Sequence, residues 1–244
     1  MIEVESVKPY YEEGSKKEQI AQMFDNVAST YDGLNRFLSL GIDVYWRKKA
    51  IAKLKSLTPK VILDVATGTA DVALETNRQL SPDSIIGVDI SALMLEIGRK
   101  KIANQGADKV ITLHLGDSEN LQFPDATFDA ATLSFGVRNF ENVEKGLREI
   151  HRVLKPNGKL IVLEFSRPRQ FPFKQLFNFY FKYILPFIGK LTSKDARAYT
   201  YLYESVQAFP DREAFITIMQ KAGFVKANFE AWTIGIVCCY EGEK

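Results

Sequence analysis

Cysteine and histidine are scarce in this sequence, with two of each among 244 residues. The cysteines, Cys238 and Cys239, are adjacent. Neighbouring residues of a strand point to opposite faces, which is a poor geometry for a disulfide bond between them. We therefore predict buried, reduced thiols, which are typical of a cytoplasmic protein. So few Cys and His side chains also give no support for a metal site.

An excess of charge of one sign is missing as well, because 32 Lys and Arg residues stand against 30 Asp and Glu residues. This near-balance argues against a polyanionic partner, so we expect no nucleic-acid binding. The chain opens without a basic segment and a following apolar run, so we expect no signal peptide. Lysines and a proline interrupt the most aromatic stretch, residues 171–190, which excludes it as a membrane span.

What the sequence does contain, from residue 60 onwards, is a regular alternation of short apolar runs and amphipathic segments. This pattern predicts helices that alternate with buried strands at 61–66, 84–90, 110–117, 128–135 and 159–166, and therefore a parallel, doubly wound sheet. Near the end, residues 225–232 and 234–241 resemble two strands joined by a tight turn at Thr233. A parallel sheet that finishes in an antiparallel hairpin is typical of the Rossmann-like class I fold of S-adenosylmethionine-dependent methyltransferases.

We predict one methyltransferase domain over residues 1–244, because the length suits a single large domain. Its parts are a helical cap (15–56), a cofactor-binding core (60–166), an aromatic helical insert that serves as a substrate lid (167–208), and a C-terminal helix with a hairpin (209–244).

The turn after the first predicted strand, within ILDVATGTAD (62–71), indicates which cofactor the core binds. In a dinucleotide-binding loop the third glycine stands at the start of the helix whose N-terminus binds the pyrophosphate. Asp71 stands there instead, and its carboxylate would repel phosphates. S-adenosylmethionine carries no phosphate and has two cationic groups, so Asp64 and Asp71 favour it over NAD. Gly68 lacks a Cβ and would let the backbone approach the cofactor closely.

Polar side chains also end the following strands. Asp89 closes the second strand, where a carboxylate can accept hydrogen bonds from both ribose hydroxyls. Asp117 and Ser118 follow the third strand and could meet the adenine, and Ser134 ends the fourth. Each residue alone is common turn chemistry. Their succession at one edge of the sheet predicts a cofactor site, with an NAD-dependent oxidoreductase as the competing interpretation.

Two segments, YDGLNRFLSLGIDVYW (31–46) and RVLKPNGKLIVLEFS (152–166), carry a more specific resemblance, supported by SFGVRNF (134–140). The chain resembles, over roughly residues 23–240, the S-adenosylmethionine-dependent quinol C-methyltransferases of menaquinone and ubiquinone biosynthesis. The resemblance implies cofactor contacts by Thr69, Asp89, Asp117, Ser118 and Ser134, to which the chemistry of the loop after the first strand adds Gly68 and Asp64. The sequence departs from the family at Asp43, Ala66 and Asn157.

The resemblance implies methyl transfer to a ring carbon of a polyprenylated hydroquinol. That carbon becomes strongly nucleophilic once the hydroquinol, whose pKa is about 10 as for Tyr, is deprotonated. We expect Arg138 to stabilise the quinolate and Asn139 to orient the ring. Tyr31 and Asp32 would complete the pocket, with Asp32 a candidate base. In the alternative interpretation, Arg138 pairs with a surface carboxylate and residues 31–32 cap a helix.

The aromatic stretch of this insert, residues 171–190, contains eight Phe and Tyr residues and no acidic residue. Written as a helix from Pro172, it places Phe173, Phe177, Tyr180, Phe181 and Ile184 on one face. A cationic, aromatic helix of this kind suits a membrane interface. A lid over an apolar pocket and a homodimer contact are the alternatives. We thus expect a cytoplasmic protein that associates peripherally with the inner face of the membrane. We favour demethylmenaquinol over a methoxy-benzoquinol as its substrate, and the sequence leaves the prenyl length open.

Overall fold

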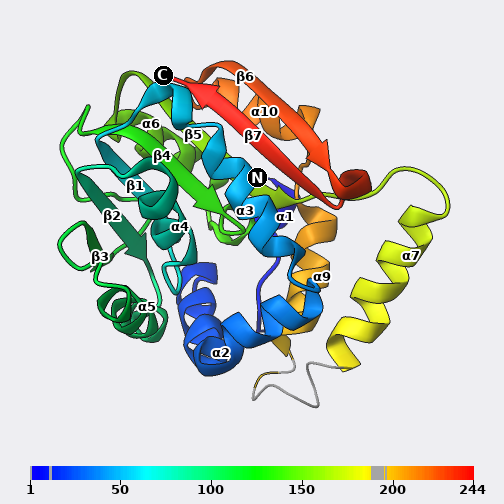
Figure 1. The fold of residues 1–244 in the computed structure, drawn as a ribbon. Helices are drawn as coiled ribbons and strands as arrows, with labels where there is room; N and C mark the ends of the chain where they lie inside the picture. The colour runs from blue at the N-terminus through cyan, green and yellow to red at the C-terminus, as the bar shows by residue number, and fades with distance from the viewer. Residues whose placement is uncertain (1, 11–12, 188–194, 196) are drawn as a thin grey trace.

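The computed structural model of the protein describes residues 2–10, 13–187, 195 and 197–244. These residues form a seven-stranded sheet in the order β3-β2-β1-β4-β5-β7-β6 (Figure 1). The first five strands of this order pair in parallel, and β7 pairs antiparallel with both β5 and β6. The strands are β1 (Val61–Val65), β2 (Ser84–Asp89), β3 (Ile111–Leu115), β4 (Phe128–Ser134), β5 (Leu154–Phe165), β6 (Val225–Trp232) and β7 (Val237–Glu243). The predicted methyltransferase fold is therefore confirmed.

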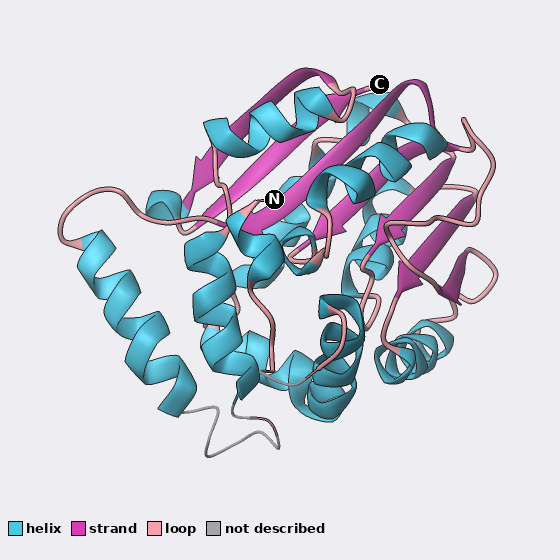
Figure 2. Cartoon of the chain, turned by 180° about the vertical axis from the view of Figure 1, so that it is seen from behind, coloured by secondary structure: helices cyan, strands magenta, loops and turns pink. Residues whose placement is uncertain are grey.

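Alternating side chains of the strands divide the core into two layers. In β1, Leu63 and Val65 belong to the cluster under α6 (Val143–Val153) and α10 (Glu213–Lys221), whereas Ile62 belongs to the cluster under α3 (Ile42–Ala52), α4 (Asp71–Leu80) and α5 (Ala92–Asn104). All three β1 side chains are fully buried, as a central strand with helices on both sides requires. Figure 2 shows helices lying across the sheet on the face turned away in Figure 1.

An N-terminal cap covers the carboxyl ends of the strands. The long helix α2 (Lys16–Leu38) crosses below these ends and continues into α3 (Figure 1). Ser15 caps α2, because its side chain accepts a hydrogen bond from the Glu18 amide at 3.2 Å while the Glu18 carboxylate accepts from the Ser15 amide at 3.0 Å. The order of the strands reverses between β1 and β4, which is where doubly wound sheets bind their ligands.

A short helix, α1 (Glu3–Ser6), precedes the cap and is a feature that sequence patterns did not indicate. Its Val4 is fully buried in the same core cluster as β1 and α6. The segment packs against the 3-10 turn η2 (Val137–Asn139), which follows β4, and against α9 (Arg197–Ala208). Residues 2–6 therefore belong to the folded domain.

The aromatic insert is helical, but its buried face differs from the predicted one. Helix α7 (Phe173–Phe179) passes into a π-helical turn, η3 (Tyr180–Ile184), at the periphery of the molecule (Figure 1). Phe177, Phe181 and Leu185 are buried against Val206, whereas Phe173, which we placed on the inner face, is 39% exposed. The π-turn brings Leu185 onto the row of Phe177 and Phe181, whereas Phe173 lies at the start of α7. Residues 188–190 of the insert lie outside the described residues.

At the other end of the chain, the hairpin of β6 and β7 turns through a 3-10 segment, η4 (Thr233–Gly235), which is longer than the tight turn we predicted. Cys238 and Cys239 lie in β7 as buried free thiols, which confirms the prediction for them. Helix α6 ends at Val153, directly before β5. Asn157 adopts φ 64°, a left-handed conformation that Asn tolerates where the family often has glycine.

Candidate active site

Two cavities open at the carboxyl ends of the strands. The larger has a volume of about 430 Å³ and extends between the cap, β4, β5, η3 and α9. The smaller, about 60 Å³, lies beside it between the start of α2 and the ends of β2 and β4. Phe24 and Ala66 line both cavities. Together the cavities form one elongated site at the reversal of strand order.

The loop after β1 forms the floor between the two cavities. Gly68 has φ +54°, a left-handed conformation that glycine adopts without strain. A Cβ added there would meet no described atom within 4 Å, so the space above this backbone is open. Its amide donates to Asp89 Oδ2 at 2.8 Å, and the Ser91 amide donates to Asp89 Oδ1 at 2.9 Å. Burial raises the pKa of Asp89, and these amide hydrogen bonds oppose that shift.

The smaller cavity collects the residues predicted to bind the adenosine part of the cofactor. Asp89, Asp117 and Ser118 all line it. Lys17 from the start of α2 pairs with Asp117, with 2.5 Å between Nζ and Oδ2. Lys17 was not predictable as a site residue, because its partner lies 100 residues away and no local pattern joins them.

Thr69 and Asp32, both predicted site residues, meet at the wall of the larger cavity. The Thr69 hydroxyl donates to Asp32 Oδ1 at 2.6 Å, and Lys101 Nζ donates to Asp32 Oδ2 at 2.9 Å. Lys101 also pairs with Asp71. Asp32 thus connects the cap to the cofactor loop, and an ammonium already compensates its charge, which makes it a weak candidate for a base.

The two acidic residues that favoured S-adenosylmethionine over NAD lie in different surroundings. Asp71 lines the larger cavity, where it pairs with Lys101, with Arg47 (3.2 Å) and with Arg36 (3.4 Å). Asp64 was expected to face the cofactor. It is 1% exposed and lies outside the described linings of both cavities.

Asp64 instead supports the loop from below. Its carboxylate accepts hydrogen bonds from the hydroxyls of Thr67 and Thr132, each at 2.6 Å. Burial raises the pKa of Asp64 to about 6, and the two hydroxyls partly offset this effect. Asp64 therefore supports the loop through Thr67 and lies behind the described linings of the cavities.

Arg138 lies at the wall of the larger cavity together with Ser134, at the end of β4. The guanidinium is partnered by a buried carboxylate and not by a surface one. Its Nη1 donates to Glu164 Oε1 at 2.7 Å and to the carbonyl of Phe135 at 2.6 Å. Arg138 is 7% exposed and Glu164 is fully buried. Among the described residues, Nε of Arg138 is buried and has no hydrogen-bond partner.

Tyr31 and Asn139 lie in different places. Tyr31 lines the larger cavity, where burial raises the pKa of its hydroxyl and the charge of Arg138 lowers it. Asn139, which we expected to orient the substrate ring, lines the smaller cavity instead. The hydroxyl of Tyr201 donates to Asn139 Oδ1 at 3.1 Å. Asn139, in η2, therefore lies at the smaller cavity, whereas Arg138 of the same turn lies at the larger one.

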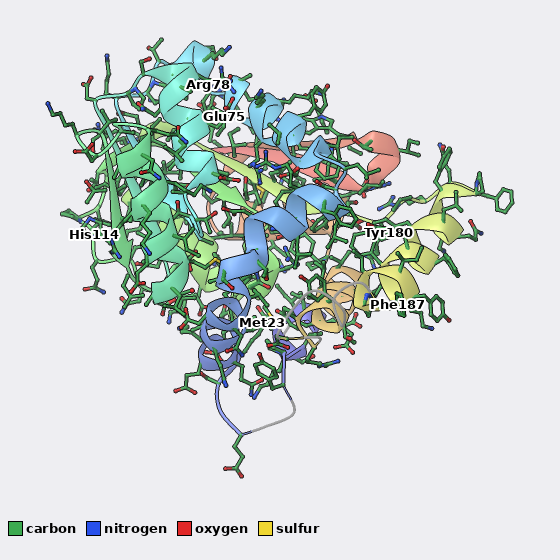
Figure 3. All side chains as sticks on the ribbon, turned by 60° about the horizontal axis from the view of Figure 1, so that its bottom comes forward. Met23, Glu75, Arg78, His114, Tyr180 and Phe187 are labelled. Carbon is green, nitrogen blue, oxygen red and sulfur yellow. The ribbon has the colours of Figure 1, made fainter. Side chains whose placement is uncertain are left out.

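The rest of the larger cavity is apolar and strongly aromatic. The rings of Phe135, Phe165 and Phe181 pack in a row. The ring centroids of Phe135 and Phe165 are 4.7 Å apart, and those of Phe165 and Phe181 are 5.7 Å apart. The aromatic side chains of its lining are Phe24, Tyr31, Trp46, Phe135, Phe165, Phe173, Phe177, Tyr180, Phe181, Tyr199 and Tyr201. Figure 3 shows Tyr180 on the insert, and its hydroxyl donates to the carbonyl of Leu38 at 2.9 Å. The insert therefore forms a side wall of this cavity.

These features fit S-adenosylmethionine as the ligand that spans the two cavities. The buried carboxylate of Asp89 has acceptor capacity beyond its two amide hydrogen bonds, since each oxygen has two lone pairs. The open space over Gly68 suits the methionine portion, which would extend towards Ser134 and the larger cavity. Thr69 would lie at that end, and Asp117 and Ser118 at the other.

Comparisons with known proteins agree with this site. A family model described as the ubiE/COQ5 methyltransferase family matches residues 12–244. A demethylmenaquinone methyltransferase of Bacteroides fragilis is 46% identical over 240 residues, which cover 98% of each chain. A ubiquinone/menaquinone biosynthesis C-methyltransferase UbiE of Geotalea daltonii is 46% identical over 230 residues, covering 94% of this chain and 97% of the relative.

Solved structures support the fold alone, since their sequence identities are low. A SAM-dependent methyltransferase of Thermotoga maritima is 20% identical with a TM-score of 0.62, covering 91% of this chain and 99% of its own. The [4+2]-cyclase SpnF is 17% identical with a TM-score of 0.61, covering 93% of this chain and 96% of its own. A cyclase on the same fold shows that architecture does not fix the reaction. The family match over nearly the whole chain is more specific, and the chain belongs to the ubiE/COQ5 methyltransferase family.

Proposed function

We propose that this protein transfers a methyl group from S-adenosylmethionine to a ring carbon of demethylmenaquinol, in menaquinone biosynthesis. The observation that carries the proposal is the juxtaposition of a buried cation with an aromatic cavity. Arg138 lies where the polar cofactor region meets the apolar wall of Phe135 and Phe165. A prenylated aromatic acceptor has the same division, with ring oxygens at one end and a hydrocarbon tail at the other.

The residues of the larger cavity have distinct tasks in this reaction. The cofactor supplies an already activated methyl group, so the protein must align the acceptor and exclude water. Arg138 would stabilise negative charge on the ring oxygen, which raises the nucleophilicity of the ring carbon. Glu164 holds the guanidinium in place from behind. The aromatic side chains Phe165 and Phe181 would hold the ring and the first part of the tail.

The acceptor proton needs a route out of the cavity. Both carboxylate oxygens of Asp32 already accept hydrogen bonds, from Thr69 and Lys101, so stabilisation of the quinolate by Arg138 is the stronger contribution. Tyr31 lines the same cavity. A raised hydroxyl pKa keeps Tyr31 protonated, and it can donate a hydrogen bond to the ring oxygen.

The direct test is methyl transfer with radiolabelled S-adenosylmethionine, using demethylmenaquinol and a 2-methoxy-6-polyprenyl-1,4-benzoquinol side by side. We expect labelled menaquinol, with a higher kcat/KM for the naphthoquinol. Preference for the benzoquinol would assign the protein to the ubiquinone branch. No transfer to either acceptor would refute the proposal.

We further propose that the mouth of the larger cavity rests on a membrane surface. No helix among the described residues has the length and apolarity to cross a membrane. Phe173, Leu176 and Ile234 both line the cavity and reach solvent, and Leu40, at the corner between α2 and α3, is 91% exposed. Exposed apolar side chains of α7 and η4 thus lie at this cavity, as suits a substrate whose tail resides in the bilayer.

The outer face of the insert extends this surface. Phe179, Tyr183 and Phe187 are all exposed, and Phe187 is labelled towards the end of the insert in Figure 3. Lys174 and Lys182 are exposed on the same helix. Cations beside apolar side chains favour an anionic lipid surface.

Vesicle co-sedimentation tests the membrane contact. Wild-type protein should bind vesicles containing phosphatidylglycerol at low salt. A variant with Phe179→Ser, Tyr183→Ser and Phe187→Ser should lose most of this binding. Val225→Ser, at an exposed apolar residue of β6, is the matched control. Equal binding by all three proteins would refute the contact, and self-association detected by sedimentation velocity would point to a second copy on this face instead.

A further inference from the structure

Lys16, at the start of α2, is buried although it carries a charge at its tip. It is 1% exposed, among the largest fully buried side chains of the described residues. Lysine is rarely buried so completely unless its ammonium is well partnered. A buried ammonium therefore calls for a specific function at this position.

The partners of Lys16 are backbone carbonyls from two different segments. Its Nζ donates to the carbonyl of Val4 at 2.6 Å and to the carbonyl of Arg138 at 3.0 Å. The first carbonyl belongs to α1, which is fixed because Val4 is fully buried in the core. The second belongs to the residue that bears the cation of the larger cavity. Lys16 thus ties the N-terminal segment to the backbone of that residue.

Further contacts hold the same stretch of backbone. The amide of Lys16 donates to Glu141 Oε1 at 2.9 Å, and the amide of Val143 donates to Glu5 Oε1 at 3.0 Å. The charged groups that face the Lys16 ammonium are Glu5, Glu119, Glu141 and the guanidinium of Arg138. Burial is the largest influence and lowers the pKa of Lys16 to about 7.

We propose that Lys16 is a positioning residue for methyl transfer, which holds the backbone of Arg138 and thereby places its guanidinium at the wall of the larger cavity. Lys16 lies outside the described linings of both cavities, so it acts through Arg138 and not on a ligand. Displacement of a catalytic group by about 1 Å can cost a hundredfold in rate. The catalytic consequence rests on the proposed function, whereas the structural one does not.

The test uses the variant Lys16→Met, whose unbranched side chain is one heavy atom shorter and lacks the donor. Lys53→Met is the matched control, because Lys53 also makes two hydrogen bonds, to Glu230 at 2.6 Å and Glu241 at 2.7 Å, but lies outside the described linings of both cavities. Three quantities are measured in each full-length protein: hydrogen exchange of the backbone over residues 135–143, the Kd of S-adenosylmethionine, and kcat with demethylmenaquinol.

For Lys16→Met we expect faster exchange over residues 135–143, a kcat lower by about 10- to 100-fold, and a cofactor Kd within about twofold of wild type. Lys53→Met should change none of the three. Wild-type kcat in Lys16→Met, or a loss shared equally by kcat and cofactor affinity, would overturn the proposal. So would faster exchange spread over the whole chain, which would indicate a merely structural role.

Two further outcomes are informative. If Lys16→Met does not fold, Lys16→Gln is measured in the same way. Its amide keeps two N–H donors but is one bond shorter, so the selective loss of kcat is again expected, and wild-type kcat overturns the proposal. If wild-type protein transfers no methyl group to the quinol, the proposed function fails. The exchange over residues 135–143 then still decides whether Lys16 positions this backbone.

Discussion

Replacing Glu164 by glutamine is expected to destabilise the protein by about 3 kcal/mol, because it leaves a buried guanidinium without its counter-charge. Glu164 is fully buried and the side chain of Arg138 is 8% exposed, so water can replace little of the lost interaction. Burial raises the pKa of Glu164 and the charge of Arg138 opposes that shift. The amide oxygen of glutamine still accepts a hydrogen bond from Arg138, which keeps the loss at the lower end of the range for such pairs.

This loss should be visible in thermal unfolding. For a chain of this size, 1 kcal/mol corresponds to about 2–4 °C in Tm, so Glu164→Gln should lower Tm by about 6–12 °C. Removing both charges together, in Arg138→Met with Glu164→Leu, should recover most of that loss, since an apolar pair of similar volume avoids desolvation of the ions.

The double variant also separates stability from catalysis. With a folded protein but no cation at the cavity wall, single-turnover methyl transfer should be slower by about 10²–10³, a typical cost of removing one stabilising donor. Cofactor affinity, measured by calorimetry, should change little. Wild-type turnover in the double variant would refute the role of Arg138. An unchanged Tm in Glu164→Gln would refute the description of the pair as desolvated.

Other substitutions test the cofactor loop and the cap. Gly68→Ala should cost about 1–2 kcal/mol in loop strain, because the φ of Gly68 is +54°, and should weaken S-adenosylmethionine binding in calorimetry. Gly33→Ala, where an added Cβ meets no described neighbour within 4 Å, should leave this binding unchanged. Asp32→Asn should weaken cofactor binding by loosening Lys101 and leave a measurable kcat. A loss of kcat beyond about 100-fold at unchanged affinity would instead identify Asp32 as the base. Because the pKa of Lys16 falls from 10.5 to about 7 on folding, the unfolded chain binds more protons between these values, so urea unfolding should show wild-type stability rising relative to Lys16→Met by about 3–4 kcal/mol from pH 7 to pH 10.

The sheet and the ends of its strands were predictable from sequence because they depend on local patterns. Apolar runs closed by Asp89, Asp117 and Ser134 place those residues at one edge of a parallel sheet, and the structure brings them to the two cavities. The ion pairs that surround Asp71 were not predictable. The partners of Asp71 come from α2, α3 and α5, and no spacing along the chain indicates that three helices converge there.

Short or irregular segments explain the remaining differences. Helix α1 has four residues and one buried apolar side chain, Val4, so it has no periodicity to detect. In the insert, a regular helical projection left out Leu185, but the π-turn at Tyr180–Ile184 changes the phase and brings Leu185 inward. Asn139 belongs to the segment SFGVRNF (134–140) that supports the resemblance. Its direction depends on the 3-10 turn η2, which spacing alone does not reveal.

The wall shared by the two cavities has a consequence for the order of binding. Phe24 and Ala66 contact both spaces, so a ligand that shifts either side chain changes the free energy of the other site. Such coupling is reciprocal: whatever factor the cofactor adds to acceptor affinity, the acceptor adds to cofactor affinity. Release of the methylated product would therefore change the affinity for the demethylated cofactor, and release of the demethylated cofactor would change the affinity for the product, through Phe24 and Ala66.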